Sequence, residues 1–591
     1  MAGNQSGNGA GRGFSRRLIS VMPIFGWLPG YKSAWLWPDL IAGLTLAAYA
    51  VPMAMAYSSL AGLAPQAGIN CYIFGGLVFA LFTSSRQLAV GPTAAISVMV
   101  ASVGGVIAAG NPASQATIAA LTAGMVALIC VVAWLLRLSA FVSFVSESIL
   151  LGFKAGAALS IAATQLPKLF GVPDGGDHLF GRLSNIVHQL GNTNITVLGI
   201  GVVAILILAL GEELLPGRPV ALFVVVLAII ISSWTGLAGY GVRVVGNLPP
   251  GLPKLGFPVV PFGQMEDLIG LAFACFLLSY IESISAARTI ALKHQYTVDP
   301  RQELLSLGAA NLMAAFGQGY TVAGGLSQSA VNDEAGARTP LSLVFASVTL
   351  MLVLMFLTDV LRSLPEVVLA AIVIVAVSGF VRISDFRRLL RVSRLEFQVA
   401  MVAFVGVLLF GILKGVMFSV VASLVFLLRL IANPHVAILG RIPGSRRFSD
   451  ITRHTDNELT PGLLIFRVEA VLLYFNVENI DKMVLNQVHA ASTPVRMVVC
   501  DLSTSPYIDA AGARMLDRLQ KQLADEDIRF TIAEAHAEVR DILRATGVDE
   551  SFGGVNRFTS VADIVDDFDG IISAADRREP GYARDNRSFR S

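Results

Sequence analysis

Long apolar runs fill the chain from about residue 35 to residue 432, and Pro, Gly and charged residues interrupt them at intervals. Such runs predict membrane-spanning helices, because a helix needs roughly 20 mainly apolar residues to cross the hydrocarbon core of a bilayer. Several are too short for a simple span, above all those near 93–109 and 327–337. Cutting the runs at the interruptions gives fourteen segments, near 39–60, 69–83, 93–109, 114–136, 141–165, 193–211, 219–236, 266–287, 301–317, 327–337, 340–357, 366–380, 396–412 and 415–431.

The pattern changes sharply near Asn433, after which charges return at the density of an ordinary soluble protein. The soluble part alternates expected strands and helices, which is typical of an α/β fold with a small central sheet. The strands are expected at Leu463–Val468, Val495–Leu502 and Phe530–Ala533, and the helices at Ala511–Leu523 and Ala537–Thr546. We therefore divide the chain into an N-terminal tail (1–34), a membrane domain (35–432), a polar linker (433–456), a soluble domain (457–575) and a disordered tail (576–591).

Composition supports the membrane assignment. Charged residues make up 14% of the 591 residues, against about 25% in soluble proteins, and none occurs between Arg86 and Arg137. The net charge of +2 comes without a basic tract interleaved with aromatics, so nothing points to nucleic acid. No Walker loop, CxxC pair, metal-ligand spacing of histidines or catalytic set stands out. We therefore expect no enzyme activity, no cofactor and no metal.

The placement of Lys and Arg predicts the orientation of the chain in the membrane. With the N-terminus inside, the cytoplasmic connections hold most of the basic residues, whereas the early outward connections hold none. The inward-facing basic residues are Arg86, Arg137, Arg218, Arg288, Lys293, Arg301, Arg338, Arg382, Arg387, Arg388, Arg391 and Arg394. An even number of spans then puts both termini and the soluble domain in the cytoplasm. We expect a multi-pass protein of the cell membrane.

Two motifs place Gly directly before a short uncharged helix. Gln87–Ser97 starts its helix at Thr93, after Gly-Pro, and Tyr320–Ser329 starts its helix at Leu326, after Gly-Gly. Either motif alone could be a kink within a transmembrane helix. The two lie seven segments apart, as expected for two repeats of seven, and an odd repeat length inverts the second copy. Inverted repeats with paired broken helices are a recurring transporter design.

Paired half-helices favour an anion as ligand. Each helix N-terminus exposes unpaired N–H groups and carries roughly half a positive charge. Two such ends that face one another form an anion site without any Lys or Arg. The hydrophobic part of the chain is therefore expected to bind a small anion near the bilayer midplane.

Glu282 is an ionisable residue well inside a predicted span, where a charge is costly and usually functional. Because burial disfavours its charged form, Glu282 is a candidate to take up and return a proton during a transport cycle. The alternative is that it lies near the cytoplasmic end and pairs with Arg288. For Lys154 we favour snorkelling or a pair with Glu147 over a substrate role, and for the Gly- and Ala-rich stretch 152–163 a close helix-packing face.

At these motifs the chain resembles the SulP (sulfate permease) family of anion transporters, and the resemblance runs from Trp37 to Phe568. The most specific motifs are Val90–Ala95, Glu282–Arg288, and Ser327–Asn332 followed by Ala335–Thr339. In the soluble part, Val499–Ser503 and Ile508–Gly512 are similar to the STAS domain that ends members of the family.

The resemblance implies an α-helical polytopic membrane protein with a uracil-permease-like fold of fourteen segments, a 7+7 inverted repeat, a core and a gate domain, and usually a homodimer. It further implies an elevator-like motion of the core against the gate. The anion would lie between the two half-helices, beside the first and eighth segments. The residues so implied to bind it are Gly91, Thr93, Ala94, Ser97, Leu326, Ser327, Gln328, Tyr49 and Met53.

The chain departs from the family pattern at several positions. Many relatives carry Arg where this chain has Gln328, and Gln where it has Met53, so backbone dipoles would supply most of the positive potential. Ala510 replaces the Ser that could be phosphorylated in the STAS domain. Sodium-coupled members tend to have Asp and, one turn later, Thr; Glu282 and Ala286 stand here instead, which favours proton coupling.

The resulting hypothesis is a secondary active transporter that takes up sulfate with protons. A bicarbonate or dicarboxylate carrier remains an alternative of the same class. An anion sensor that signals through the STAS domain to a cytoplasmic partner is an alternative of another class.

Overall fold

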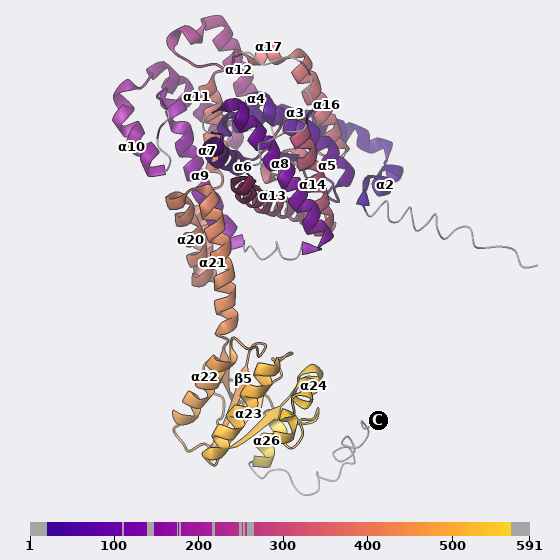
Figure 1. Cartoon of the computed structure of the whole chain (residues 1–591), viewed down its shortest axis with the longest axis vertical. Coiled ribbons are helices and arrows are strands. Elements are labelled where there is room, and N and C mark those ends of the chain that lie inside the picture. Colours follow the sequence, from indigo (N-terminus) through magenta and orange to yellow (C-terminus); the bar gives the residue numbers. More distant parts are fainter. Residues whose placement is uncertain are drawn as a thin grey trace, which may run out of the picture. The chain divides into compact units, whose positions relative to one another are not determined.

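The computed structural model describes residues 21–108, 111–138, 147–173, 175, 179–214, 219–246, 251, 255–256 and 265–568. Residues 1–20 of the expected N-terminal tail, residues 141–146 of the expected fifth segment and the expected C-terminal tail 576–591 lie outside the described residues. Residues 21–34 of the expected N-terminal tail are described and include the short helix α2 (Ile24–Trp27). The chain divides into two compact units, Met1–Leu424 and Val425–Ser591. Figure 1 shows the first as a bundle of helices and the second as a smaller body that contains strands.

Each of the fourteen expected segments coincides with a helix or a run of helices. Additional short helices are α2 (Ile24–Trp27), α10 (Leu179–Gln189), α17 (Thr358–Leu361) and α19 (Ile383–Val392). In chain order the fourteen are α3 (Leu36–Leu60); α4 (Pro65–Asn70), the π-helical turn η3 (Cys71–Gly75) and α5 (Gly76–Phe82); α6 (Ala94–Met99), the π-helical turn η4 (Val100–Gly104) and α7 (Gly105–Ile107); α8 (Pro112–Leu135); α9 (Glu147–Phe170); α11 (Ile195–Leu214); α12 (Val220–Thr235); α13 (Met265–Lys293); α14 (Pro300–Phe316); α15 (Leu326–Glu334); α16 (Leu341–Phe356); α18 (Glu366–Ser378); α20 (Arg394–Phe410); and α21 (Ile412–Ala432).

Six helical stretches in the described part of the chain are long and apolar enough to cross a membrane. Further apolar helices are shorter, among them Ala94–Ile107 and Leu341–Phe356. The six are Ser33–Leu60, Pro65–Phe82, Ala113–Leu135, Ser148–Phe170, Leu268–Lys293 and Glu366–Val392. The helices that start at Ala94 and Leu326 are thus short, as the sequence predicts for half-helices.

Small residues let the helices pack closely. A Cβ on Gly43 of α3 would lie 2.5 Å from Cβ of Phe345 on α16, and one on Gly152 of α9 would lie 1.9 Å from the carbonyl oxygen of Ala400 on α20. Such contacts leave no room for a side chain, and they give the van der Waals packing that joins helices in a membrane. The expected packing face at residues 152–163 is therefore confirmed at Gly152.

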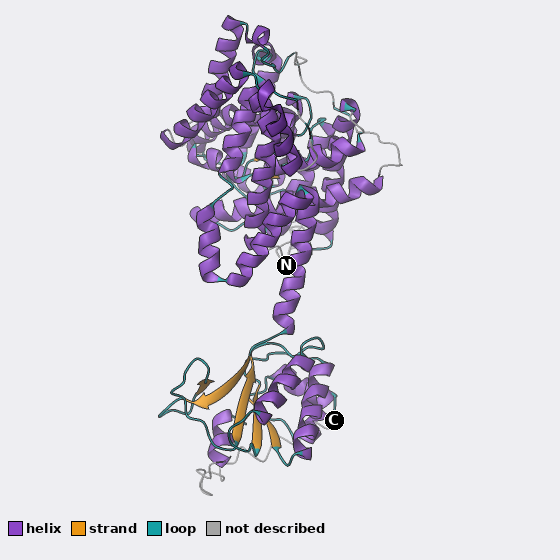
Figure 2. Ribbon diagram, turned by 90° about the vertical axis from the view of Figure 1, so that its left-hand side faces the viewer, coloured by secondary structure: helices purple, strands orange, loops and turns teal. Residues whose placement is uncertain are grey.

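The second unit is built on a five-stranded sheet with the order β4-β3-β5-β6-β7. Strands β5, β6 and β7 are parallel, whereas β3 pairs antiparallel with both β4 and β5 (Figure 2). The strands are β3 (Val436–Arg441), β4 (Phe448–Asp450), β5 (Leu463–Val468), β6 (Met497–Asp501) and β7 (Arg529–Ala533), and the helices are α22 (Val477–His489), α23 (Ala510–Asp525), α24 (Ala537–Ala545), α25 (Val548–Ser551) and α26 (Val561–Phe568).

Both faces of this sheet are covered. Leu464, Phe466 and Val468 of β5 join a cluster with α22, α23 and α24, whereas Leu463 and Ile465 join a second cluster with α26. The three strands and two helices expected from the sequence are present. The expected linker 433–456 is different, because it contributes β3 and β4 to the sheet. β3 begins with the short apolar run Val436–Leu439, whereas β4 has only three residues, and pairing within the sheet supplies the hydrogen bonds that fix both strands.

Candidate functional site

Two very short strands join the starts of the half-helices. Strand β1 (Val90–Gly91) pairs antiparallel with β2 (Ala323–Gly324), with Val90 opposite Gly324 and Gly91 opposite Ala323. Helix α6 begins shortly after β1 and helix α15 shortly after β2. The pairing therefore brings together the first turns of two helices that are more than 200 residues apart in the sequence.

The crossing of β1 and β2 requires a glycine at position 91. A Cβ on Gly91 would lie 2.3 Å from the ring of Tyr72, which is far inside van der Waals contact. Tyr72 is buried in the π-helical turn η3, and its hydroxyl donates a hydrogen bond to Oε1 of Gln328. Gly91 thus lets β1 lie directly against the ring that holds the second half-helix.

Gln328 is a structural link between the two strands. Its Nε2 donates to the carbonyl oxygens of Ala89 (3.0 Å) and Ala323 (2.9 Å), while its Oε1 accepts from Tyr72. The side chain is 3% exposed, so these bonds use its polar atoms in the interior. The resemblance implied that Gln328 contacts the anion; here its side chain holds the half-helix in position instead.

Ser97 is committed to similar internal bonds. Its hydroxyl donates to the carbonyl oxygen of Thr93 at 2.8 Å and lies 3.0 Å from the hydroxyl of Tyr320. The side chain is fully buried. Ser97 therefore ties the first turn of α6 to the segment that leads into β2.

Two residues that the sequence did not single out hold β2 from its other side. Asn311 of α14 makes two bonds with the backbone of Val322, through Nδ2 (3.1 Å) and Oδ1 (3.0 Å), as a neighbouring strand would. Ser283 of α13 accepts the N–H of Gly324 at 2.7 Å. A buried Asn within an apolar helix, and a Ser beside Glu282, were the available signals.

Both half-helices begin without a side-chain cap. Thr93 and Gly325 occupy the N-cap positions of α6 and α15, and neither makes a side-chain capping bond. The first helical bonds are Ser97 N–H to Thr93 and Ser329 N–H to Gly325, so the N–H groups before them lack helical partners. Several other helices are capped by a side chain, among them those that follow Asn111, Asn194, Asp299, Ser393, Asp509 and Ser560.

Glu282 and Thr93 place two unsatisfied polar atoms near the start of α6. Glu282 Oε2 and Thr93 Oγ1 are both shielded from solvent and have no hydrogen-bond partner among the described residues. Thr93 lies next to the carboxyl group of Glu282, and the ammonium group of Lys154 is close enough to interact with it electrostatically. No ion pair joins Glu282 to Arg288 in the described part of the chain, so that alternative fails. The side chain of Glu147, the other expected partner of Lys154, lies outside the described residues.

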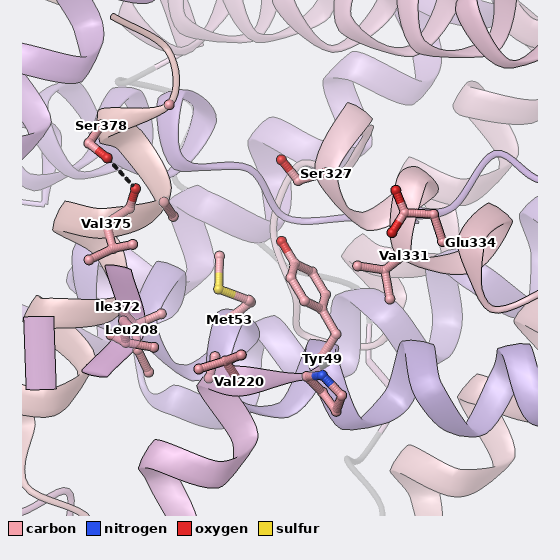
Figure 3. A pocket seen from close by; sticks show the side chains of 14 residues that line it. Tyr49, Met53, Leu208, Val220, Ser327, Val331, Glu334, Ile372, Val375 and Ser378 are labelled. Atoms are coloured by element: carbon pink, nitrogen blue, oxygen red, sulfur yellow. Dashed lines mark hydrogen bonds between the residues drawn. The ribbon is translucent and has the colours of Figure 1, made fainter. Parts of the chain in front are cut away.

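A cavity of about 350 Å³ reaches the start of the second half-helix. Figure 3 shows the hydroxyl end of Tyr49 directed toward Ser327, with Met53 beside it. The lining is largely apolar and includes the carboxyl group of Glu334, and no Lys or Arg of the described residues belongs to it. It consists of Tyr49, Met53, Leu208, Pro219, Val220, Ala221, Ser327, Val331, Glu334, Ile372, Val375, Ala376, Ser378 and Gly379.

The structure divides the expected site residues into groups. Tyr49, Met53 and Ser327 line the cavity. Gly91, Ser97 and Gln328 hold the half-helices in place and do not line it. The remaining residues, Thr93, Ala94, Leu326 and Glu282, belong to the first turns or lie beside them without lining the cavity. Two further polar residues of the lining had no specific signal in the sequence: Ser378 ends the apolar helix α18, and Glu334 ends the short polar helix α15.

Comparison with known proteins gives a consistent result. Residues 36–403 match the model of the sulfate permease family, and residues 454–564 match the STAS domain. A probable sulfate transporter of Mycobacterium tuberculosis is 31% identical over 93% of this chain and 100% of its own length. The chloroplastic sulfate transporter 4.1 of Arabidopsis thaliana is 29% identical over 93% of this chain and 82% of its own length.

Solved structures share the fold. The murine solute carrier 26 family member A9, an anion transporter in the inward-facing state, matches with a TM-score of 0.84 at 24% identity, over 96% of both chains. The transmembrane domain of the cyanobacterial bicarbonate transporter BicA matches with a TM-score of 0.58 at 23% identity, over 66% of this chain and 98% of that one.

Proposed function

Because this chain belongs to the sulfate permease family and is a membrane anion transporter of that kind, we propose that it takes up sulfate or a similar oxyanion together with protons. The observation that carries the proposal is the pair of uncapped helix starts, joined by β1 and β2, beside the unpartnered polar atoms of Thr93 and Glu282. Free N–H groups at helix N-termini are the donors that an oxyanion needs.

We place the anion between the first turns of α6 and α15. The backbone N–H groups of Ala94 and Leu326 and the hydroxyls of Thr93 and Ser327 would donate to its oxygens. Tyr49 and Met53 of α3 would form the wall of the path along which it leaves. Since none of the described residues that line the cavity is Lys or Arg, we infer that the helix dipoles and the nearby Lys154 supply the positive potential.

Glu282 is the proposed proton carrier. Its carboxyl group lies beside the proposed anion position, and its Oε2 has no protein partner in the described part of the chain. A proton on Glu282 would cancel the repulsion between the carboxylate and an arriving dianion. Proton and anion would therefore bind in the same state and be released together.

The cavity supports an inward-open state of an elevator cycle. Its lining includes Glu334 and Ser378, which lie four residues before the basic residues Arg338 and Arg382. The abundance of Arg after these two helix ends predicts that they face the cytoplasm. Toward the opposite side, Lys168 of α9 donates a hydrogen bond to Ser59 of α3 at 2.8 Å, which closes one helix against the other. A core of α3, α6, α13 and α15 would slide against a gate that includes α9, in an inverted-repeat protein that forms a homodimer.

Uptake of labelled sulfate into proteoliposomes under an imposed proton gradient tests the proposal. We expect the gradient to accelerate uptake by the native protein and to have no effect on Glu282→Gln. Glu334→Gln is the matched control, because it removes a carboxyl group from the cavity but leaves Glu282 in place. An unchanged response of Glu282→Gln to the gradient would refute the coupling.

The substrate and the role of the C-terminal domain are tested in the same assay. If bicarbonate or a dicarboxylate inhibited the uptake of labelled sulfate more strongly than unlabelled sulfate does, that anion would be the preferred substrate in place of sulfate. The sensor alternative predicts little flux from the membrane domain alone. Because β3 begins at Val436, the domain must be removed from residue 433 onward to leave no broken sheet. Robust flux after that deletion would argue against a sensor.

A further inference from the structure

Helix α19 carries a dense cluster of arginines between two apolar helices. Arg387, Arg388 and Arg391 lie within its ten residues, and Arg382 and Arg394 flank it. Spacings of three and four residues put Arg387, Arg388 and Arg391 on one side of the helix. All five side chains are exposed.

These arginines have no acidic partner in the part of the chain that the structure describes. None of them forms an ion pair there, and Arg382 donates a hydrogen bond to the backbone carbonyl oxygen of Gly379 at 3.4 Å. Of the exposed arginines elsewhere, Arg446 pairs with Asp563 at 2.6 Å, whereas Arg453, Arg514 and Arg518 form no ion pair in the described part of the chain. What sets α19 apart is density: three arginines and a single acid, Asp385, lie within ten residues, so the helix is a concentration of positive charge.

The same helix exposes apolar side chains beside the charges. Phe386 packs against Phe404 of α20, with ring centroids 6.2 Å apart, and this contact fixes the inner face of the helix. Ile383 and Leu390, two turns apart on the flank between Phe386 and the arginines, are 63% and 47% exposed. A helix with arginines on one side and exposed aliphatic residues on its flank is typical of a segment that lies in the headgroup region of a membrane.

The neighbours of α19 in the chain set its depth. It follows α18 after four residues and precedes α20 after one, and both are apolar helices of the membrane domain. Its position at a membrane surface follows from this connectivity. Free phosphate would contact the arginines but not Ile383 and Leu390. A phospholipid offers a phosphate to the arginines and acyl chains to the two aliphatic side chains.

We propose that α19 is a docking surface for the headgroups of anionic phospholipids. The phosphates bind Arg387, Arg388 and Arg391, while Ile383 and Leu390 contact the first carbons of the acyl chains. Since α19 packs against α9 and α20, bound lipid holds these two helices at a fixed level in the bilayer. The surface is separate from the cavity and from both half-helices.

Thermal unfolding of the purified full-length protein in mild detergent tests this surface. Phosphatidylglycerol is added to one sample and phosphatidylcholine with the same acyl chains to another. We expect phosphatidylglycerol to raise Tm more than phosphatidylcholine does, and the triple variant R387Q/R388Q/R391Q to lose this difference. At roughly fivefold per basic residue, the variant binds phosphatidylglycerol about 100-fold more weakly in a native mass spectrometry titration.

Two control variants keep the test specific. R453Q/R514Q/R518Q removes the same charge from exposed positions of the C-terminal domain and keeps the native response to lipid. R387K/R388K/R391K keeps the positive charge, and we expect it to retain most of the response to lipid. This variant separates the loss of charge from a simple loss of stability in the Gln variant. An equal Tm shift in the Gln variant, or the same shift of the native protein with inorganic phosphate, would overturn the proposal.

Discussion

The hydroxyl of Tyr72 donates a hydrogen bond to Oε1 of Gln328, which lies 256 residues further along the chain. The bond joins the π-helical turn η3 to the first turn of the half-helix α15, and the Nε2 of Gln328 extends the link to the backbone of Ala89 and Ala323. Together with the pairing of β1 and β2 and the contact between Ser97 and Tyr320, this neutral side chain holds the two half-helices in register and leaves their first N–H groups free.

Gln328→Leu should destabilise the protein. It removes the donor to the carbonyl oxygens of Ala323 and Ala89 and the acceptor of the Tyr72 hydroxyl, and of these Ala89 keeps a bond from the hydroxyl of Ser329 at 3.3 Å. A buried polar group that is left unpaired costs about 1–3 kcal/mol. Tyr72→Phe removes a single bond and should cost about 1 kcal/mol. Thermal unfolding should therefore rank Tm as native, Tyr72→Phe, Gln328→Leu. Ser327→Ala is the control, because Ser327 is next in the chain but faces the cavity. This variant should keep Tm and lower sulfate uptake. A larger loss of Tm in Ser327→Ala than in Gln328→Leu would contradict the structural role of Gln328.

Gly91→Ala should disrupt the crossing of β1 and β2. The added Cβ would lie 2.3 Å from the Tyr72 ring, which is buried and held by Gln328, so the strand must move. We expect low yield or a loss of several degrees in Tm, together with loss of uptake. In Gly105→Ala the nearest atom is 3.9 Å away, and this change within the helix should gain up to about 1 kcal/mol. If both variants behave alike, the close approach at Gly91 is not important.

Thr93 should tolerate Ser but not Val. The Val side chain has nearly the same shape but lacks the hydroxyl that lies beside Glu282. Thr93→Val would lose the proposed hydrogen bond from the Thr93 hydroxyl to the bound anion. Because a hydrogen bond to a charged group contributes about 1.5–3 kcal/mol, we expect kcat/KM for sulfate to fall roughly ten- to hundredfold. Thr93→Ser should retain most of the activity in the same uptake assay. Equal activity of the two variants would remove Thr93 from the proposed site.

Asp450 should make the C-terminal domain sensitive to acid. Burial by itself would raise the pKa of Asp450, but hydrogen bonds from His435 and Thr452 outweigh it and lower the pKa to about 2. Since the folded-state pKa lies below the ordinary value of 3.8, the carboxylate stabilises the fold above about pH 4, and this contribution is lost as the pH falls toward 2.

Urea unfolding of residues 433–591 at pH 7 and pH 3 measures this effect. Asp450→Asn should lower the free energy of unfolding at pH 7 and narrow its difference between the two pH values. Asp456→Asn, at an exposed position without an ion pair in the described part of the domain, should leave both values unchanged. A native pH response in Asp450→Asn would show that other groups control acid unfolding.

Much of the fold follows from local sequence pattern. Apolar runs and their interruptions predicted all fourteen membrane segments, since the bilayer demands both length and apolarity. The parallel strands β5, β6 and β7 were also predicted, because β-rich runs alternate with amphipathic helices. Strands β3 and β4 and helix α22 were not predicted. The two strands are short and are stabilised by pairing within the sheet. In α22, charged residues separate the apolar positions, which are buried only in the folded domain.

The sequence by itself determined that two Gly-led half-helices exist and that Glu282 lies within a span. The structure decided what each residue near them does. Gln328 and Ser97 look like ligands in the sequence, yet their hydrogen bonds are used internally, whereas Thr93 and Glu282 keep buried polar atoms without a partner. The reason is physical: whether a polar atom is free depends on which distant backbone groups lie within 3 Å of it, and local sequence pattern does not contain those distances.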